Sequence, residues 1–256
     1  MTLMTNQTFA QLAGVEYNVQ ELKRGPIVYG ITHRVIPQFN VLKDMGECVL
    51  ITSFSDASVT REDADKLPSN VKRWFSTNVM TDSPRVEAIP IGFVYNYERT
   101  QIILRMLDGF RQNVNLMYVN FERNIPRQIN PREGLYEKFG KKPWVTCKGG
   151  AAAIHASPEE FYEDLLAHKY VLSPPGCGPD CHRHWESMAF GAIPIVLRSK
   201  ATELLEDMPC LLVDNFMEVG EDLLNAKYEE LKQRFGGQSL IKLEMDYWAE
   251  RIMRWV

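Results

Sequence analysis

Short apolar runs and amphipathic segments alternate along the chain. The apolar runs are rich in β-branched residues and are bounded by glycine, proline or polar residues, which is typical of buried β-strands. The amphipathic segments repeat apolar residues three and four positions apart, as Ile102, Ile103 and Met106 do, which predicts helices with one buried face. Strands are predicted at 26–32, 47–52, 86–93, 115–121, 144–147, 169–173 and 193–197. Helices are predicted at 38–45, 97–111, 132–139, 157–167, 182–190, 228–234 and 242–255.

One helix start carries a specific signal. Ser157 is a good N-cap, Pro158 suits the first turn, and Glu160 stands at the capping-box position. Residues 58–70 are polar and predict a loop or an exposed helix, whereas 71–79 predicts a partly buried segment.

The alternation of strands and helices determines the expected fold class. It predicts βαβ units, and hence α/β architecture with parallel sheets covered on both faces. Two such runs occur, so we expect two halves, at 1–112 and 113–256, with a cleft between them. Ligands of such folds bind beyond the carboxyl ends of the strands.

Composition excludes several classes of protein. The 256 residues are 45% hydrophobic and 24% charged, which is ordinary for a globular chain. The net charge of -4 does not fit a general nucleic-acid surface. No run approaches the roughly 20 apolar residues of a membrane span, and residues 1–20 lack the features of a secretory signal. Five scattered cysteines favour a reduced, intracellular protein.

The segment 170–196 carries the clearest chemistry: strand, Gly/Pro loop, helix, glycine turn and strand. Gly176 and Gly178 let the backbone approach a ligand closely. A helix starting near Asp180 offers free N–H groups and a positive dipole end to an anion such as pyrophosphate. Arg183 in the first turn adds a charge-assisted bond, and Glu186 on the same face suits a ribose diol. The alternative is an exposed ion pair between Arg183 and Glu186.

These residues carry a resemblance to a family. Tyr170-Val-Leu-Ser-Pro-Pro-Gly, Asp180-Cys-His-Arg-His-Trp-Glu-Ser-Met and Gly191-Ala-Ile-Pro-Ile-Val resemble the donor-binding signature of exostosin-like glycosyltransferases. Weaker similarities lie at 89–92, 118–121 and 142–145, so that the resemblance spans about 50–218. The chain is shorter than the animal members and is similar to short, soluble microbial and viral versions. This departure from the animal members puts heparan-type substrates in doubt. The expected location is the cytoplasm, or the host cytoplasm for a viral protein.

The resemblance implies a GT-B fold, in which two Rossmann-like domains face each other across a cleft and the second binds a nucleotide-sugar. It implies that Arg183 faces the donor phosphates and that Glu186 meets the ribose. It also implies direct displacement with inversion, and a last helix, 247–255, that crosses back onto the first domain; a cap on the second domain is the alternative.

An acceptor hydroxyl needs a base, which is a carboxylate or a histidine. Asp56 and His33 each follow a predicted strand in the first half and are the two candidates. An Asx turn at Asp56 and a loop histidine at His33 are the alternatives.

Further donor-binding candidates surround the signature. A solvated loop is the alternative for its arginines, and Trp185 and Phe190 are predicted to pack in the core. The candidates are Asn120, Arg123, Arg127, Arg132, Lys148 and His182.

We expect no metal site and no cofactor. Cys177, Cys181, His182 and His184 suggest zinc, but Cys147 and Cys210 do not form a second pair of ligands by spacing.

The expected function is a hexosyl- or pentosyltransferase of glycan biosynthesis. It moves sugar from a UDP- or GDP-sugar to a hydroxyl of a glycan or glycoconjugate. A nucleotide-sugar epimerase, a non-catalytic nucleotide- or glycan-binding protein and a zinc-stabilised interaction module are the alternatives. Donor sugar, acceptor and oligomeric state leave no motif in the sequence.

Overall fold

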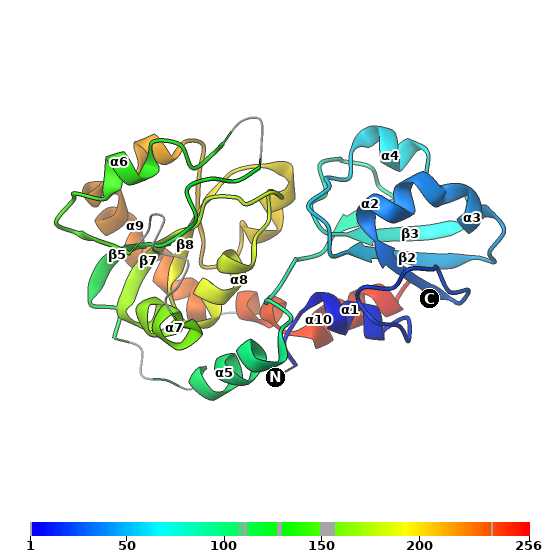
Figure 1. The fold of residues 1–256 in the computed structure, drawn as a ribbon, viewed down its shortest axis with the longest axis horizontal. Helices are drawn as coiled ribbons and strands as arrows, with labels where there is room; N and C mark the ends of the chain where they lie inside the picture. The colour runs from blue at the N-terminus through cyan, green and yellow to red at the C-terminus, as the bar shows by residue number, and fades with distance from the viewer. Residues whose placement is uncertain (1, 108, 110–111, 127–129, 149–156, 237) are drawn as a thin grey trace.

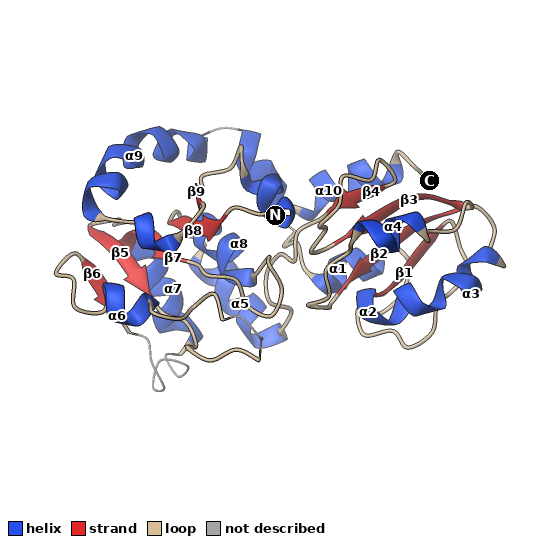
Figure 2. Cartoon of the chain, turned by 90° about the horizontal axis from the view of Figure 1, so that it is seen from above, coloured by secondary structure: helices blue, strands red, loops and turns tan. Residues whose placement is uncertain are grey.

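The protein is an α/β structure with two parallel sheets, which confirms the predicted fold class (Figures 1 and 2). The structure is a computed structural model that describes residues 2–107, 109, 112–126, 130–148, 157–236 and 238–256. The sheets lie side by side along the longest axis of the molecule in Figure 1.

The first sheet has the order β1-β2-β3-β4, and every pair in it is parallel. Its strands are β1 (Ile27–Ile31), β2 (Cys48–Ser53), β3 (Val71–Ser76) and β4 (Val86–Ala88). Between them the chain forms α2 (Thr32–Val35), α3 (Phe39–Lys43) and α4 (Arg61–Asp65).

Alternate residues of the first sheet enter two different cores, because successive side chains of a strand point to opposite faces. Leu50 and Trp74 pack in a cluster with residues of the crossover helices, such as Phe39. Ile51 and Phe75 enter a second cluster, which holds residues of α1 (Asn6–Gln11) and α10 (Met245–Met253). The two helices lie together along the first sheet in Figure 1.

The second sheet has the order β6-β5-β7-β8-β9, again all parallel. Its strands are β5 (Asn115–Val119), β6 (Val145–Cys147), β7 (His168–Leu172), β8 (Ile193–Leu197) and β9 (Leu211–Val213). Its helices are α5 (Tyr97–Met106), α6 (Leu135–Phe139), α7 (Pro158–Ala167), α8 (His182–Ala189) and α9 (Glu221–Gln233).

The cluster beside α1 and α10 continues into the second sheet. It includes Val171 of β7 and Trp185 of α8, which are fully buried. Trp185 and Phe190 therefore pack in the core, as predicted. On the other face of the second sheet, Tyr170 and Ile195 pack with residues of α6 and α9.

The segments near both chain termini pack against the first sheet. Leu3 and Glu244 form an antiparallel bridge, and the Met245 N–H donates to the Thr2 carbonyl at 3.1 Å. Arg251 of α10 pairs with Glu87 of β4.

The helix α5 packs against α7, which belongs to the second half, although the boundary predicted at 112 assigns α5 to the first half. That boundary stays a prediction.

Most predicted elements occur, many with shorter bounds; α9 instead begins at Glu221 rather than at 228, and the partly buried segment predicted at 71–79 contains the strand β3. The strand predicted at 86–93 ends at Ala88, since Pro90 has no N–H to donate and Gly92 turns the chain with φ 69°. The helix predicted from 132 begins at Leu135, after Gly134 with φ 73°. The capping box of Ser157 and Glu160 is present. The pattern missed α1, α2 and β9, which are all short.

The packing of α10 on the first sheet gives a stability prediction. Ile252 is fully buried, whereas its neighbour Met253 is 52% exposed. We expect Ile252→Ala to lower the free energy of unfolding by about 2–5 kcal/mol, through lost burial and a residual cavity. Met253→Ala is the control and should change it by less than about 0.5 kcal/mol. Urea unfolding measures both, and equal effects would place α10 off the sheet.

Candidate functional site

A cavity of about 320 Å³ opens where the second sheet ends beside the loop that precedes α8. Six of its lining residues matter for its chemistry: Arg99, Asn120, Phe121, Arg132, Arg183 and Glu186. They come from α5, from the ends of β5 and of the following loop, and from α8. The cavity lies at carboxyl ends of parallel strands, where such folds bind ligands.

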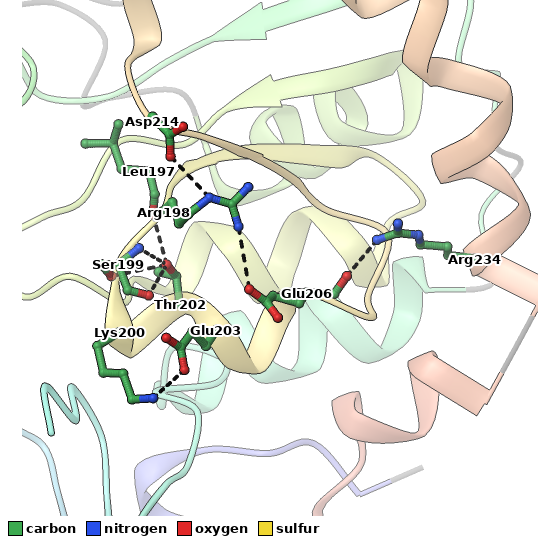
Figure 3. A network of polar contacts seen from close by, with 9 residues as sticks. All are labelled: Leu197, Arg198, Ser199, Lys200, Thr202, Glu203, Glu206, Asp214 and Arg234. Atoms are coloured by element: carbon green, nitrogen blue, oxygen red, sulfur yellow. Dashed lines mark hydrogen bonds and ion pairs between the residues drawn. The ribbon is translucent and has the colours of Figure 1, made fainter. Parts of the chain in front are cut away.

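A larger cavity, of about 530 Å³, lies between residues 79–88, residues 200–206 and α10. Its charges are already paired. Lys200 contacts Asp82 and Glu203, and Arg251 contacts Glu87. Figure 3 shows the Lys200–Glu203 pair within a network of polar contacts. We therefore take the smaller cavity, whose cations lack such partners, as the candidate site.

Arg183 is the most telling residue of this cavity. It stands in the first turn of α8, and its Nε and Nη1 are buried without a hydrogen-bond partner. No described carboxylate lies within 4.0 Å of its guanidinium, so the alternative ion pair with Glu186 does not form. The side chain as a whole is half-buried, and two buried guanidinium nitrogens without an acceptor are costly, which indicates that an anion belongs here.

Two further arginines face the same space. Arg132 is 8% exposed and donates from Nε to the Pro175 carbonyl at 3.0 Å and from Nη1 to the Glu122 carbonyl at 2.7 Å. These partners are neutral, so its charge stays uncompensated. Burial and the nearby Arg183 lower the pKa of Arg132. Arg99 also has a buried Nε without a partner.

Glu186 is a hydrogen-bond acceptor at this site. It is 3% exposed and accepts a hydrogen bond from the Tyr162 hydroxyl at 3.2 Å. Burial, and then the charge of Glu186, raise the pKa of Tyr162, which keeps that hydroxyl protonated as a donor. Glu186 lines the cavity, and its carboxylate can accept hydroxyl hydrogens from a ligand.

Asp180 does a different task from the one expected of it. The helix begins at His182 with Cys181 as N-cap, in agreement with the predicted range 182–190, so Asp180 lies two residues before it. The Asp180 carboxylate accepts the Ile91 N–H at 2.8 Å and the Trp185 indole N–H at 2.9 Å. Its own N–H donates to the Asn78 side chain at 3.1 Å. Asp180 thus joins α8 to segments that follow β3 and β4.

The two candidate glycines also differ. A Cβ on Gly178 would lie 2.8 Å from the Asn78 Nδ2, so glycine is needed for close approach of the loop to the first half. A Cβ on Gly176 would make an ordinary 3.6 Å contact with Arg132. Gly178 therefore serves contact between the halves, and Gly176 lies beside a cavity residue.

Among the candidate bases, the first half contributes exposed groups. His33 contacts the Ser55 hydroxyl through Nδ1 at 2.9 Å. Asp56 is exposed, and its charge acts on His182, whose pKa it raises against a larger lowering by burial. His182 lines the cavity and contacts the Gly92 carbonyl through Nδ1 at 2.7 Å.

The remaining candidates separate into two groups. Asn120 lines the cavity and donates to the Tyr118 hydroxyl at 2.7 Å. Arg123 pairs with Glu137, and Lys148 pairs with Asp164. Neither cation lines the cavity. Arg127 lies outside the described residues.

Sequence reasoning missed Arg99, Glu122 and Phe161. All three line the cavity. Glu122 stands beside predicted candidates in the chain, but Arg99 and Phe161 belong to α5 and α7, and no local motif marks them. Only the packing of these helices beside the second sheet brings them to the site.

No three metal-ligating side chains gather in the described part of the chain. His184 is buried and contacts the Ser173 hydroxyl at 2.8 Å. The sequence contains an Asp-x-Asp tripeptide, Asp63–Asp65, a spacing found in cation sites. Asp63 closes the capping box of α4, and Asp65 pairs with Arg61.

Comparisons with known proteins add little to this picture. No family model and no curated protein matches the chain. A solved structure, "Crystal structure of GtfA/B complex", is similar over 97% of this chain and 58% of that chain, at 12% identity and a TM-score of 0.41. The exostosin resemblance thus stays a prediction. Within the described residues, no helix has the length and apolarity to cross a membrane.

The buried Asp180 gives a pH prediction. Burial raises its pKa from the ordinary 3.8 to about 6. Such a group contributes stability below about pH 4 that is lost as the pH rises through about 6. We expect the free energy of unfolding of the wild type, relative to Asp180→Asn, to fall by on the order of 3 kcal/mol over this range.

Urea unfolding followed by tryptophan fluorescence at several pH values measures this difference. His184, whose pKa burial lowers to about 4, titrates over the same range with the opposite sign. Because each charge acts on the pKa of the other, the comparison is made in a His184→Asn background, where the difference isolates Asp180. A difference that does not change with pH would contradict the burial of an ionisable carboxyl.

Proposed function

We propose that the protein is a glycosyltransferase that uses a nucleoside-diphosphate sugar as donor. It transfers the sugar, with inversion, to a hydroxyl of a glycan or glycoconjugate. UDP- and GDP-sugars are the donors to test, and neither a metal nor another cofactor is part of the proposal.

The observation that carries the proposal is the pair of buried guanidinium nitrogens of Arg183, Nε and Nη1, which lack a hydrogen-bond partner. Arg132 and Arg99 lie around the same cavity, and none of the three forms an ion pair there with a described carboxylate. Three cations that line one cavity without a direct ion pair suit a ligand with several negative oxygens, such as a diphosphate. The amino end of α8 adds a positive dipole end beside Arg183.

Glu186 supports a nucleoside diphosphate over a bare pyrophosphate. A buried carboxylate one helical turn from the phosphate-binding arginine would repel phosphate oxygens. It would instead accept hydrogens from a ribose diol. The pair of opposite charges on one helix face thus fits a ligand with a charged part followed by a hydroxyl-bearing part.

The reaction follows from this placement of charge. The acceptor oxygen forms a bond to the anomeric carbon as the bond from that carbon to the phosphate oxygen breaks. The electron pair leaves with the nucleoside diphosphate, whose growing charge faces Arg183 and Arg132. Fixed cations whose positions are set before the reaction stabilise such a leaving group more than water does.

A panel of UDP- and GDP-sugars tests the proposal. We expect at least one donor to raise the melting temperature, since a ligand that binds the folded state stabilises it. Release of nucleoside diphosphate, first to water and then to a glycan panel, should follow for that donor. Binding without turnover would indicate a binding protein, and a changed sugar still attached to nucleotide would indicate an epimerase.

Arg183→Ala should weaken nucleoside-diphosphate binding by about 1.5–3 kcal/mol, the range of a hydrogen bond to a charged group. Isothermal titration with UDP and GDP measures the change. Arg198→Ala is the matched control, because Arg198 follows β8 at the same sheet edge but is exposed and paired with Asp214 (Figure 3). Equal affinity of wild type and Arg183→Ala would overturn the site.

A further inference from the structure

We propose that His182 is the catalytic base of the transfer and that its Nε2 takes the proton of the acceptor hydroxyl. This inference rests on the proposed function and deepens it. It assigns His182 a role other than holding the donor phosphates.

The hydrogen bond to Gly92 determines the tautomer of His182. Its Nδ1 lies 2.7 Å from the Gly92 carbonyl oxygen, and a carbonyl oxygen can only accept. The hydrogen of the neutral ring is therefore on Nδ1, and Nε2 carries a lone pair. A neutral ring in this tautomer has nothing to donate to a phosphate through Nε2, but it can accept a proton there.

The Gly92 carbonyl is itself held firmly in place. Gly92 has φ 69°, and a Cβ there would lie 2.2 Å from the Met4 carbonyl oxygen, so only glycine fits. The next residue, Phe93, donates its N–H to the same Met4 oxygen at 2.8 Å. A segment near the amino terminus thus fixes the carbonyl that orients the His182 ring.

Charged groups face His182 from three elements. Glu186 lies on its own helix, Arg99 on α5, and Asp56 beyond β2. Burial lowers the pKa of His182 most, Arg99 lowers it further, and Glu186 and Asp56 raise it. The net lowering leaves the ring neutral at neutral pH and ready to accept a proton. The two carboxylates then face the imidazolium that forms.

The proton balance is simple. The acceptor O–H bond breaks and its proton moves to Nε2, while that oxygen forms the bond to the anomeric carbon. The nucleoside diphosphate leaves with the electron pair of the broken C–O bond. His182 then returns its proton to water. Because His182 and Arg183 are neighbours at the start of α8, one helix end places the base and the cation that receives the leaving group.

Two experiments test the assignment, and the first is independent of activity. Long-range ¹H–¹⁵N spectra of protein with labelled histidine report the tautomer, and the signal of His182 is identified by its loss in His182→Asn. We expect the Nδ1–H form at neutral pH and a pKa below 6.5. An Nε2–H form, or a ring that is charged at neutral pH, would overturn the proposal.

The second experiment measures kcat for the donor that the panel selects, with water as acceptor, and the affinity for UDP and GDP. His182→Asn retains an N–H near the Nδ1 position to donate to Gly92 but lacks Nε2. We expect kcat to fall about 10²–10⁴-fold, the usual contribution of a general base. Nucleotide affinity should change less than about twofold, and the fall in rate of the wild type at acid pH should disappear.

The outcomes separate this inference from the proposed function. If the wild type turns over and His182→Asn keeps the full kcat, the assignment of His182 as the base is wrong, but the proposed transferase function is unaffected. An equal loss of nucleotide affinity and rate also overturns it, because His182 would then hold the donor. The base would instead lie in the first half if His182→Asn stayed active while Asp56→Asn or His33→Asn lost kcat. That variant would also lose the fall in rate that the wild type shows at acid pH. Absence of turnover from any donor would overturn both proposals together.

Discussion

The buried carboxylate of Asp180 is the contact on which the site depends. An ionisable group without solvent is costly unless donors surround it. Here the donors come from both halves: a backbone N–H after β4 and the indole of Trp185 in α8. Asp180 stands two residues before α8, so this contact fixes the start of that helix against the first half. The positions of His182, Arg183 and Glu186 follow from it.

The charge of the chain and the charge of the site have opposite signs. The net charge is -4, yet three arginines gather around one cavity. Many acidic residues pair with lysines and arginines at the surface, where such pairs contribute little to stability. The cations of the cavity instead meet carbonyl oxygens, aromatic rings and one another. A negative surface with a local positive cavity suits a small anionic ligand better than an extended polyanion.

The local pattern of the sequence predicted what depends on neighbouring residues. The strands, the capping box at Ser157 and the core positions of Trp185 and Phe190 follow from periodicity and short-range chemistry. The glycine-rich segment before α8 marked Arg183 and Glu186. It misjudged Asp180, because a motif does not show whether a carboxylate points outward or meets an N–H about ninety residues away. Arg123 and Lys148 lie off the cavity because Glu137 and Asp164, from other elements, bind them.

The packing of α10 on the first sheet has a consequence for biosynthesis. One face of that sheet needs Trp248 and Ile252 of α10, which are made only after the sheet and helices of the second half. During translation the first half therefore leaves the ribosome with an apolar face uncovered, while the second half follows as an almost complete unit. Such a nascent chain depends on chaperones, or on rapid release, to avoid association through that face. The native structure of the first half therefore requires synthesis through α10. A chain that stops short of α10 keeps an exposed apolar face through which it can aggregate.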